Sequence, residues 1–129
     1  MTIAELCLLA AIILIVVTIL PAKILGRASY DNANPRDPAF FRDAFAARSL
    51  GAHQNGFETF PFFAAAVLLA EMRGVPQTRL DWLAIGFVAA RLLYVGCYLG
   101  NRPTMRSVVW AAGFALNLAI FFSPMGIGR

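Results

Sequence analysis

The chain has 129 residues, of which 60% are hydrophobic and 14% are charged, and its mean hydropathy is +0.69. Soluble domains are about half apolar and about a quarter charged, so this composition excludes an ordinary soluble enzyme or binding domain. The net charge of +4 does not indicate nucleic-acid binding, because the basic residues cluster beside apolar segments, where they act as membrane-topology determinants. The length accommodates about four spans of about 20 residues each, and the apolar runs are too long for an outer-membrane barrel. We therefore predict one all-α integral membrane domain over residues 1–129, a four-transmembrane-helix bundle.

The first predicted span covers residues 3–25 and is rich in Leu, Ile and Val. Glu5 near its start and the lack of a basic N-terminal region argue against a cleaved signal peptide, so we expect a retained helix. Pro21 is expected to kink its end. Residues 26–39 contain the Asn and Pro residues of turns and form the longest polar connection.

The second predicted span, residues 40–73, is too long for one crossing, and Pro61 is expected to bend it. Helical spacing places five of its residues on one stripe: Arg48, Gly51, Asn55, Glu58 and Phe62. A charge at mid-bilayer costs about 2.5–3.5 kcal/mol even on lenient scales, so a partner helix or a polar ligand must offset that cost.

The third and fourth predicted spans cover residues 79–99 and 104–122, each preceded by a short turn containing Gly and Pro. Arg91, Tyr94 and Tyr98 share one face of the third span, because they are spaced i, i+3 and i+7. The fourth span opens with Arg106 and Ser107.

The basic residues predict the orientation. Seven of them flank the connections after spans one and three (Lys23, Arg27, Arg36, Arg42, Arg48, Arg102 and Arg106), whereas three lie on the opposite side. The positive-inside rule then places these connections in the cytoplasm and both termini on the other side. The polar residues of spans two, three and four consequently meet at one depth, near the cytoplasmic leaflet. A cavity offering cations, a carboxylate, an amide and phenols suits a small zwitterionic ligand with several carboxylates.

Two stretches carry a family resemblance: AHQNGFETFPFF in span two, and RLLYVGCYLGNRPTMRS across spans three and four. The sequence resembles the MAPEG family, the membrane-associated proteins of eicosanoid and glutathione metabolism, over essentially its whole length. The combination of Asn-x-x-Glu-x-x-Pro, Tyr-x-x-x-Tyr and Arg-Ser carries this resemblance.

The resemblance implies a homotrimer that binds glutathione as co-substrate between neighbouring subunits and that acts on lipophilic small molecules or lipids. Its implied catalytic residues are Arg106, facing the thiol, and Ser107. Its implied glutathione-binding residues are Arg27, Arg48, Asn55, Glu58, Arg91, Tyr94 and Tyr98. The chain departs from the family pattern at Gly51 and Gln54, where many relatives have basic residues, and Arg48 is placed to substitute.

Structural alternatives stay open for several of these residues. Glu58 and Arg91 would serve equally as a buried ion pair that fixes helix register. His53 lies off the stripe, which favours a packing role, and Asn117 suits an interhelical hydrogen bond. The two cysteines lack metal-ligand spacing, so we expect packed thiols and no metal site.

Three functions compete at this stage. The first is a glutathione-dependent transferase or peroxidase. The second is a non-catalytic lipid-binding or scaffold member of the same family, which Gly51 and Gln54 favour. The third is a small proton-coupled exporter, against which the clustering of polar residues on one side argues. Short loops and small size favour a bacterial inner membrane.

Overall fold

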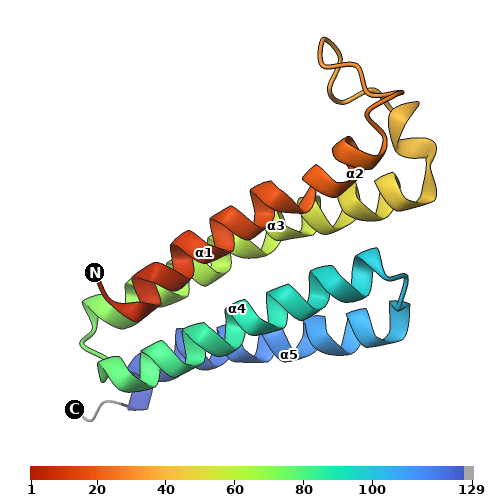
Figure 1. The fold of residues 1–129 in the computed structure, drawn as a ribbon. Helices are drawn as coiled ribbons and strands as arrows, with labels where there is room; N and C mark the ends of the chain where they lie inside the picture. Colours follow the sequence, from red (N-terminus) through yellow and green to blue (C-terminus); the bar gives the residue numbers. More distant parts are fainter. Residues whose placement is uncertain (127–129) are drawn as a thin grey trace.

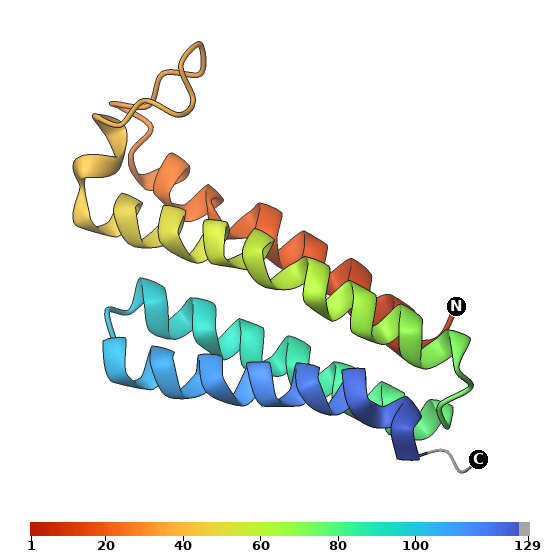
Figure 2. The same ribbon diagram turned by 180° about the vertical axis from the view of Figure 1, so that it is seen from behind.

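The computed structural model describes residues 1–126, and its long helices form two antiparallel pairs. The elements are α1 (Ile3–Thr18), α2 (Leu20–Leu25), η1 (Phe40–Arg42), α3 (Ala44–Met72), α4 (Gln77–Leu99), α5 (Pro103–Phe122) and η2 (Ser123–Gly126). Helix α1 lies along α3, and α4 lies along α5, in both views of the ribbon (Figures 1 and 2). The start of α1 and the end of α5 lie at one end of the bundle, and the connection between α2 and α3 projects from the other. The all-helical prediction is therefore confirmed for the described residues.

The first predicted span is interrupted where the sequence predicts a kink. Helix α1 ends at Thr18, whose hydroxyl donates to the Leu14 carbonyl at 2.6 Å, and α2 starts at Leu20. Pro21 lies in the first turn of α2, where a missing N–H leaves no helical hydrogen bond unmade.

The helix of the second predicted span begins later than the predicted start at residue 40. Residues Phe40–Arg42 form a 3-10 turn, and α3 begins at Ala44. Asp43 is the cause, because its carboxylate accepts hydrogen bonds of 3.0 Å from the Phe45 and Ala46 amides and so caps the helix. Helix α3 then continues through Pro61 to Met72.

The turns between the later helices follow their sequence. Gly74 adopts a positive φ of 69° after α3, a conformation that glycine takes without steric cost. Asn101 adopts a φ of 54° after α4, and Pro103 opens α5 in a first-turn position.

The packed core lies in the half of the bundle that holds the termini. Its centre is the stacked pair Phe63 and Phe87, whose ring centroids are 4.0 Å apart. Small residues dominate the rest, which lets the helices approach closely. The other buried core residues are Ala4, Cys7, Ala11, Ala66, Val67, Ala70, Val75, Leu80, Ala84 and Ile120.

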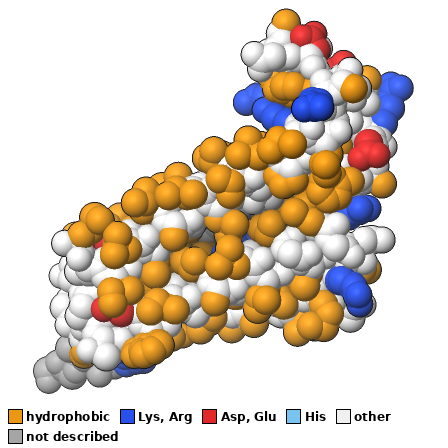
Figure 3. All heavy atoms as spheres, in the orientation of Figure 1, with side chains coloured by type: hydrophobic (Ala, Val, Ile, Leu, Met, Phe, Trp, Pro, Cys, Tyr) orange, Lys and Arg blue, Asp and Glu red, His pale blue; other side chains and the backbone are white. Residues whose placement is uncertain are grey.

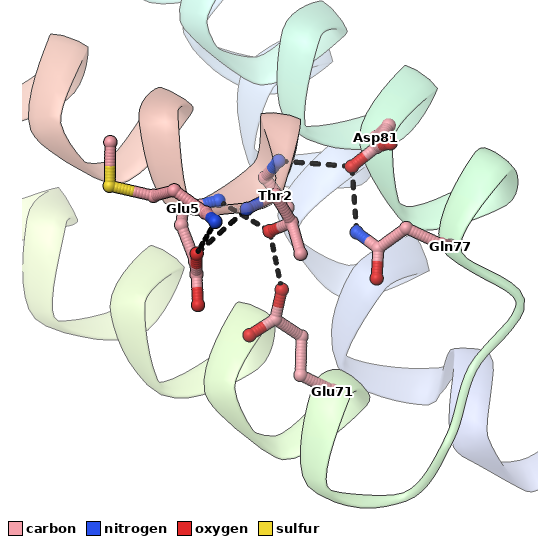
Figure 4. A network of polar contacts seen from close by, with 7 residues as sticks. Thr2, Glu5, Glu71, Gln77 and Asp81 are labelled. Atoms are coloured by element: carbon pink, nitrogen blue, oxygen red, sulfur yellow. Dashed lines mark hydrogen bonds and ion pairs between the residues drawn. The ribbon is translucent and has the colours of Figure 1, made fainter.

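A polar network closes the bundle at the same end (Figure 4). The Thr2 hydroxyl donates to Glu71 at 2.8 Å, and the Ala4 amide donates to Asp81 at 3.0 Å. Thr2 and Glu5 form a reciprocal capping box. Residues of two other helices, α3 and α4, are thereby tied to the start of α1.

Three stretches are long and apolar enough to cross a membrane: Ile3–Leu25, Gln77–Leu99 and Pro103–Met125. Helix α3 is not among these stretches, although its 29 residues would extend about 43 Å. Hydrophobic side chains cover most of the face drawn in Figure 3, and the Lys and Arg side chains visible on it gather mostly at the α2 end. The structure thus has the surface of an integral membrane protein.

Candidate functional site

The polar stripe of α3 lies against the second helix pair. Arg48 donates from Nε to the Leu99 carbonyl at the end of α4, at 3.3 Å. Seven residues further along α3, the Asn55 side-chain amide donates to Glu58 Oε2 at 3.1 Å. The stripe therefore positions its polar groups toward α4 and α5, in the half of the bundle away from the termini.

Gly51 provides the space for Tyr98. A Cβ placed on Gly51 would lie 2.8 Å from Tyr98 Cζ and would overlap the phenol oxygen more severely. The tyrosine hydroxyl thus occupies the volume that a side chain at position 51 would need. Gly51 is therefore a packing feature that makes room for Tyr98.

Two cations flank a pair of aromatic rings along α4 and across to α5. The Arg91 guanidinium lies 4.2 Å from the Tyr94 ring centroid, and the Arg106 guanidinium lies 4.3 Å from that of Tyr98. The two tyrosine rings meet edge to face, with centroids 5.6 Å apart. Four of the predicted site residues therefore form one continuous stack, in which each cation faces an aromatic ring.

A cavity of about 150 Å³ adjoins this stack between α3, α4 and α5. Its polar lining comes from Asn55, Glu58, Thr59, Arg91 and Asn117. Its apolar lining comes from Phe62, Phe87, Val109, Trp110, Gly113 and Phe114. Polar groups and a mainly aromatic wall thus share one space.

Arg91 is the most unusual member of the lining. It is only 7% exposed, yet it makes no ion pair or hydrogen bond with any described residue. Its guanidinium makes a cation–π contact with the Tyr94 ring. The proposed ion pair between Glu58 and Arg91 is therefore absent from this part of the chain. The guanidinium nitrogens of Arg91 retain some exposure and Arg91 lines the cavity, so the site has unused capacity for a negatively charged group.

Two amide oxygens in the same cavity also lack partners. Asn55 Oδ1 and Asn117 Oδ1 are buried and accept no hydrogen bond from the described residues. Asn117 is 7% exposed, and its predicted interhelical hydrogen bond is not made within residues 1–126.

Other predicted site residues lie elsewhere. Arg27 is exposed in the turn after α2 and makes no hydrogen bond or ion pair to another predicted site residue. Ser107 is exposed, and its hydroxyl donates to the Pro103 carbonyl of its own helix at 3.1 Å. His53 Nδ1 lies 2.6 Å from the Ile15 carbonyl, which fits its expected packing role.

The α5 wall of the cavity was not predicted from the sequence. Trp110 and Phe114 stack with centroids 5.4 Å apart, and Gly113 and Asn117 complete the same helical face. The spacing of these four residues, i, i+3, i+4 and i+7, was the available signal.

The chain belongs to the MAPEG family, whose family pattern it matches over residues 3–126. This match confirms the resemblance drawn from the span-two and span-three motifs. No curated protein and no solved structure matches the chain.

Proposed function

We propose that this MAPEG protein is a membrane-bound glutathione transferase or peroxidase. Its glutathione thiolate would attack a lipophilic electrophile or a hydroperoxide. Buried Arg91 is the observation that carries this proposal, since it lacks an anion among the described residues and lines a cavity with Asn55 and Glu58. Glutathione carries two carboxylates and one ammonium group, so a guanidinium and a carboxylate at one site complement its charges.

The stack of rings and cations suggests how the thiol is activated. A free thiol has a pKa of about 8.5, so little of it is thiolate at neutral pH. A guanidinium held beside the sulfur lowers the pKa of the thiol and so favours the thiolate. Arg106 would supply this guanidinium, and it lies over the Tyr98 ring in the first turn of α5. In conjugation, a sulfur–carbon bond forms and the leaving group departs with its electron pair. In peroxide reduction, sulfur takes the terminal oxygen, the O–O bond breaks and the alcohol leaves.

We further propose that α3 is the fourth membrane-crossing helix and that the protein is a homotrimer. Helix α3 lies alongside α1 for most of its length, and α1 belongs to an apolar span (Figure 1). The basic residues at the α2 end favour placing that end in the cytoplasm. The short loops and small size of the chain favour a bacterial inner membrane. Apolar substrates would then enter from the lipid and glutathione from the water.

The test is glutathione conjugation to a chlorodinitrobenzene by the full chain in nanodiscs. We expect Arg106→Ala to lower kcat/KM by at least about 100-fold, the size of effect seen when one electrostatic donor is removed. Arg102→Ala is the matched control, because Arg102 is an exposed arginine in the same turn. Equal turnover by both variants, or no glutathione binding by calorimetry in the unmodified chain, would contradict the proposal.

A non-catalytic lipid-binding role is the second candidate, and the aromatic wall of the cavity favours it. Six apolar or glycine residues line that space, and Gly51 removes a basic residue common in relatives. A copurified lipid together with no thiol chemistry would support this candidate.

A further inference from the structure

We propose that the cavity between α3, α4 and α5 binds a small amphiphile that carries a hydroxyl group, and that Asn117 recognises this hydroxyl. The proposal rests on the cavity itself and does not depend on glutathione chemistry.

Asn117 supplies the first argument. It is 93% buried, it lines the cavity, and its side-chain oxygen Oδ1 is buried without a hydrogen-bond partner among the described residues. Such amides are costly to leave unpaired in an apolar setting. The amide offers one acceptor and one donor face, and a hydroxyl is the smallest ligand group that both donates and accepts.

The walls supply the second argument. Phe62, Phe87, Gly113 and Phe114 supply apolar walls of the cavity, and the other polar side chains in its lining belong to Asn55, Glu58, Thr59 and Arg91. A volume of about 150 Å³ holds a benzene-sized body. The ligand class is therefore a ring-sized or short-chain apolar body with one hydroxyl head.

The position of Asn117 on α5 separates it from Arg106, which does not line the cavity, although Arg91 of the cationic stack does. Asn117 lies seven residues beyond Trp110 on α5, about 10 Å further along the helix axis. Phe62 is 68% exposed and Phe114 is 47% exposed, so the cavity is open at its rim in the single chain.

The chain contains its own reporter for this test. It has two tryptophans, of which Trp110 lines the cavity, and Trp82 is 69% exposed on α4 and does not line it. The variant Trp82→Phe leaves Trp110 as the single fluorophore. Its quenching by 4-bromobenzyl alcohol is compared with its quenching by 4-bromotoluene, which differs by one hydroxyl. Quenching of a tryptophan octyl ester in the same nanodiscs corrects for partitioning.

We expect the alcohol to half-quench Trp110 at a concentration about three- to tenfold lower than the toluene, the net effect of one hydrogen bond. Adding Asn117→Val should abolish this preference. Adding Asn117→Thr, which has the same shape as valine and keeps a hydroxyl, should preserve part of it.

Equal half-quenching concentrations for the two probes in the Trp82→Phe protein would overturn the proposal, and this comparison needs no change at position 117. The same preference in the valine and threonine variants would overturn the role of Asn117.

Discussion

The contact between Gly51 and Tyr98 shows how one small residue can shape a site. Gly51→Ala places a methyl group against Tyr98, and overpacking of this kind costs about 1–3 kcal/mol. The gain from better helix propensity is about 1 kcal/mol, so we expect a net loss of stability. Thermal unfolding in detergent measures it.

Two further variants isolate the cause. Gly96→Ala is the matched control, since a Cβ there meets nothing within 4 Å, and it should stabilise the protein. The double variant Gly51→Ala with Tyr98→Phe should recover stability, because the phenol oxygen is the atom most severely overlapped. If Gly51→Ala also raised the melting temperature, the assigned packing would be wrong.

Arg91 predicts a conflict between stability and binding. A buried guanidinium without an anion destabilises the ligand-free protein, so Arg91→Met should raise its free energy of unfolding by about 1–4 kcal/mol. The same variant should lose any stabilisation by glutathione. Denaturant titration with and without glutathione measures both effects.

Arg106→Met is the control for this prediction. Arg106 is only half-buried, and its charge already reaches the polar end of the bundle, so its removal should not stabilise the ligand-free chain. Lower stability of Arg91→Met without glutathione would show that Arg91 is already paired in the assembled protein.

Some of these residue contacts could be predicted from the sequence and others could not. The stripe from Arg48 to Phe62 was predictable, because helical spacing alone puts those residues on one face. The Gly51–Tyr98 contact was not, because it depends on the exact rotation of α4 against α3. The sequence indicates a partner for Asn117 on another helix, and only the packed structure shows that its amide oxygen is buried and unpaired within the described residues.

At the scale of the elements, Asp81 joins two helices. Its carboxylate accepts from the Ala4 amide at the start of α1 and from Gln77 Nε2 at 2.8 Å (Figure 4). Asp81→Ala leaves an amide in the first turn of α1 unpaired, and loss of such a cap costs about 0.5–2 kcal/mol.

We expect the first-turn amides of α1 to exchange faster with deuterium in Asp81→Ala, whereas those of α5 should not change. Arg79→Ala is the neighbouring control, because Arg79 is exposed and makes no hydrogen bond or ion pair with the described side chains. Unchanged exchange in α1 would mean that Thr2 and Glu5 suffice to hold that turn.

The boundaries of the helices follow the same rule: those set by residues adjacent in sequence were predictable, and those that depend on packing were not. The turns at Gly74 and Pro103 follow from residues adjacent in sequence, and they were predicted closely. The start of α3 was placed four residues too early, although Asp43 is a standard cap, because the apolar pair Phe40 and Phe41 resembled the beginning of a span. The proposed fourth membrane span, α3, carries a polar stripe that must be buried against other helices. Hydropathy alone does not take such burial into account, and α3 is not among the three apolar stretches.

At the scale of the whole molecule, Glu58 argues for assembly. Its carboxylate is exposed on the surface of this single chain and is bonded there only to Asn55, while Phe57 and Phe62 beside it are also exposed. Contact with lipid would cost about 2.5–3.5 kcal/mol for the charge, which a neighbouring subunit would avoid by covering it.

The proposed homotrimer predicts a detergent-corrected mass of three times the 14.0 kDa chain mass for the purified protein. The variant Glu58→Leu distinguishes a monomer from a trimer. In a monomer the change removes a lipid-exposed charge and raises stability at constant mass. In a trimer it removes a polar contact between subunits, so the particles should shift toward smaller mass on dilution. Phe62→Leu is the control, because it replaces one exposed apolar residue with another and should leave the mass unchanged. A single-chain mass for the unmodified protein at all concentrations would contradict the trimer.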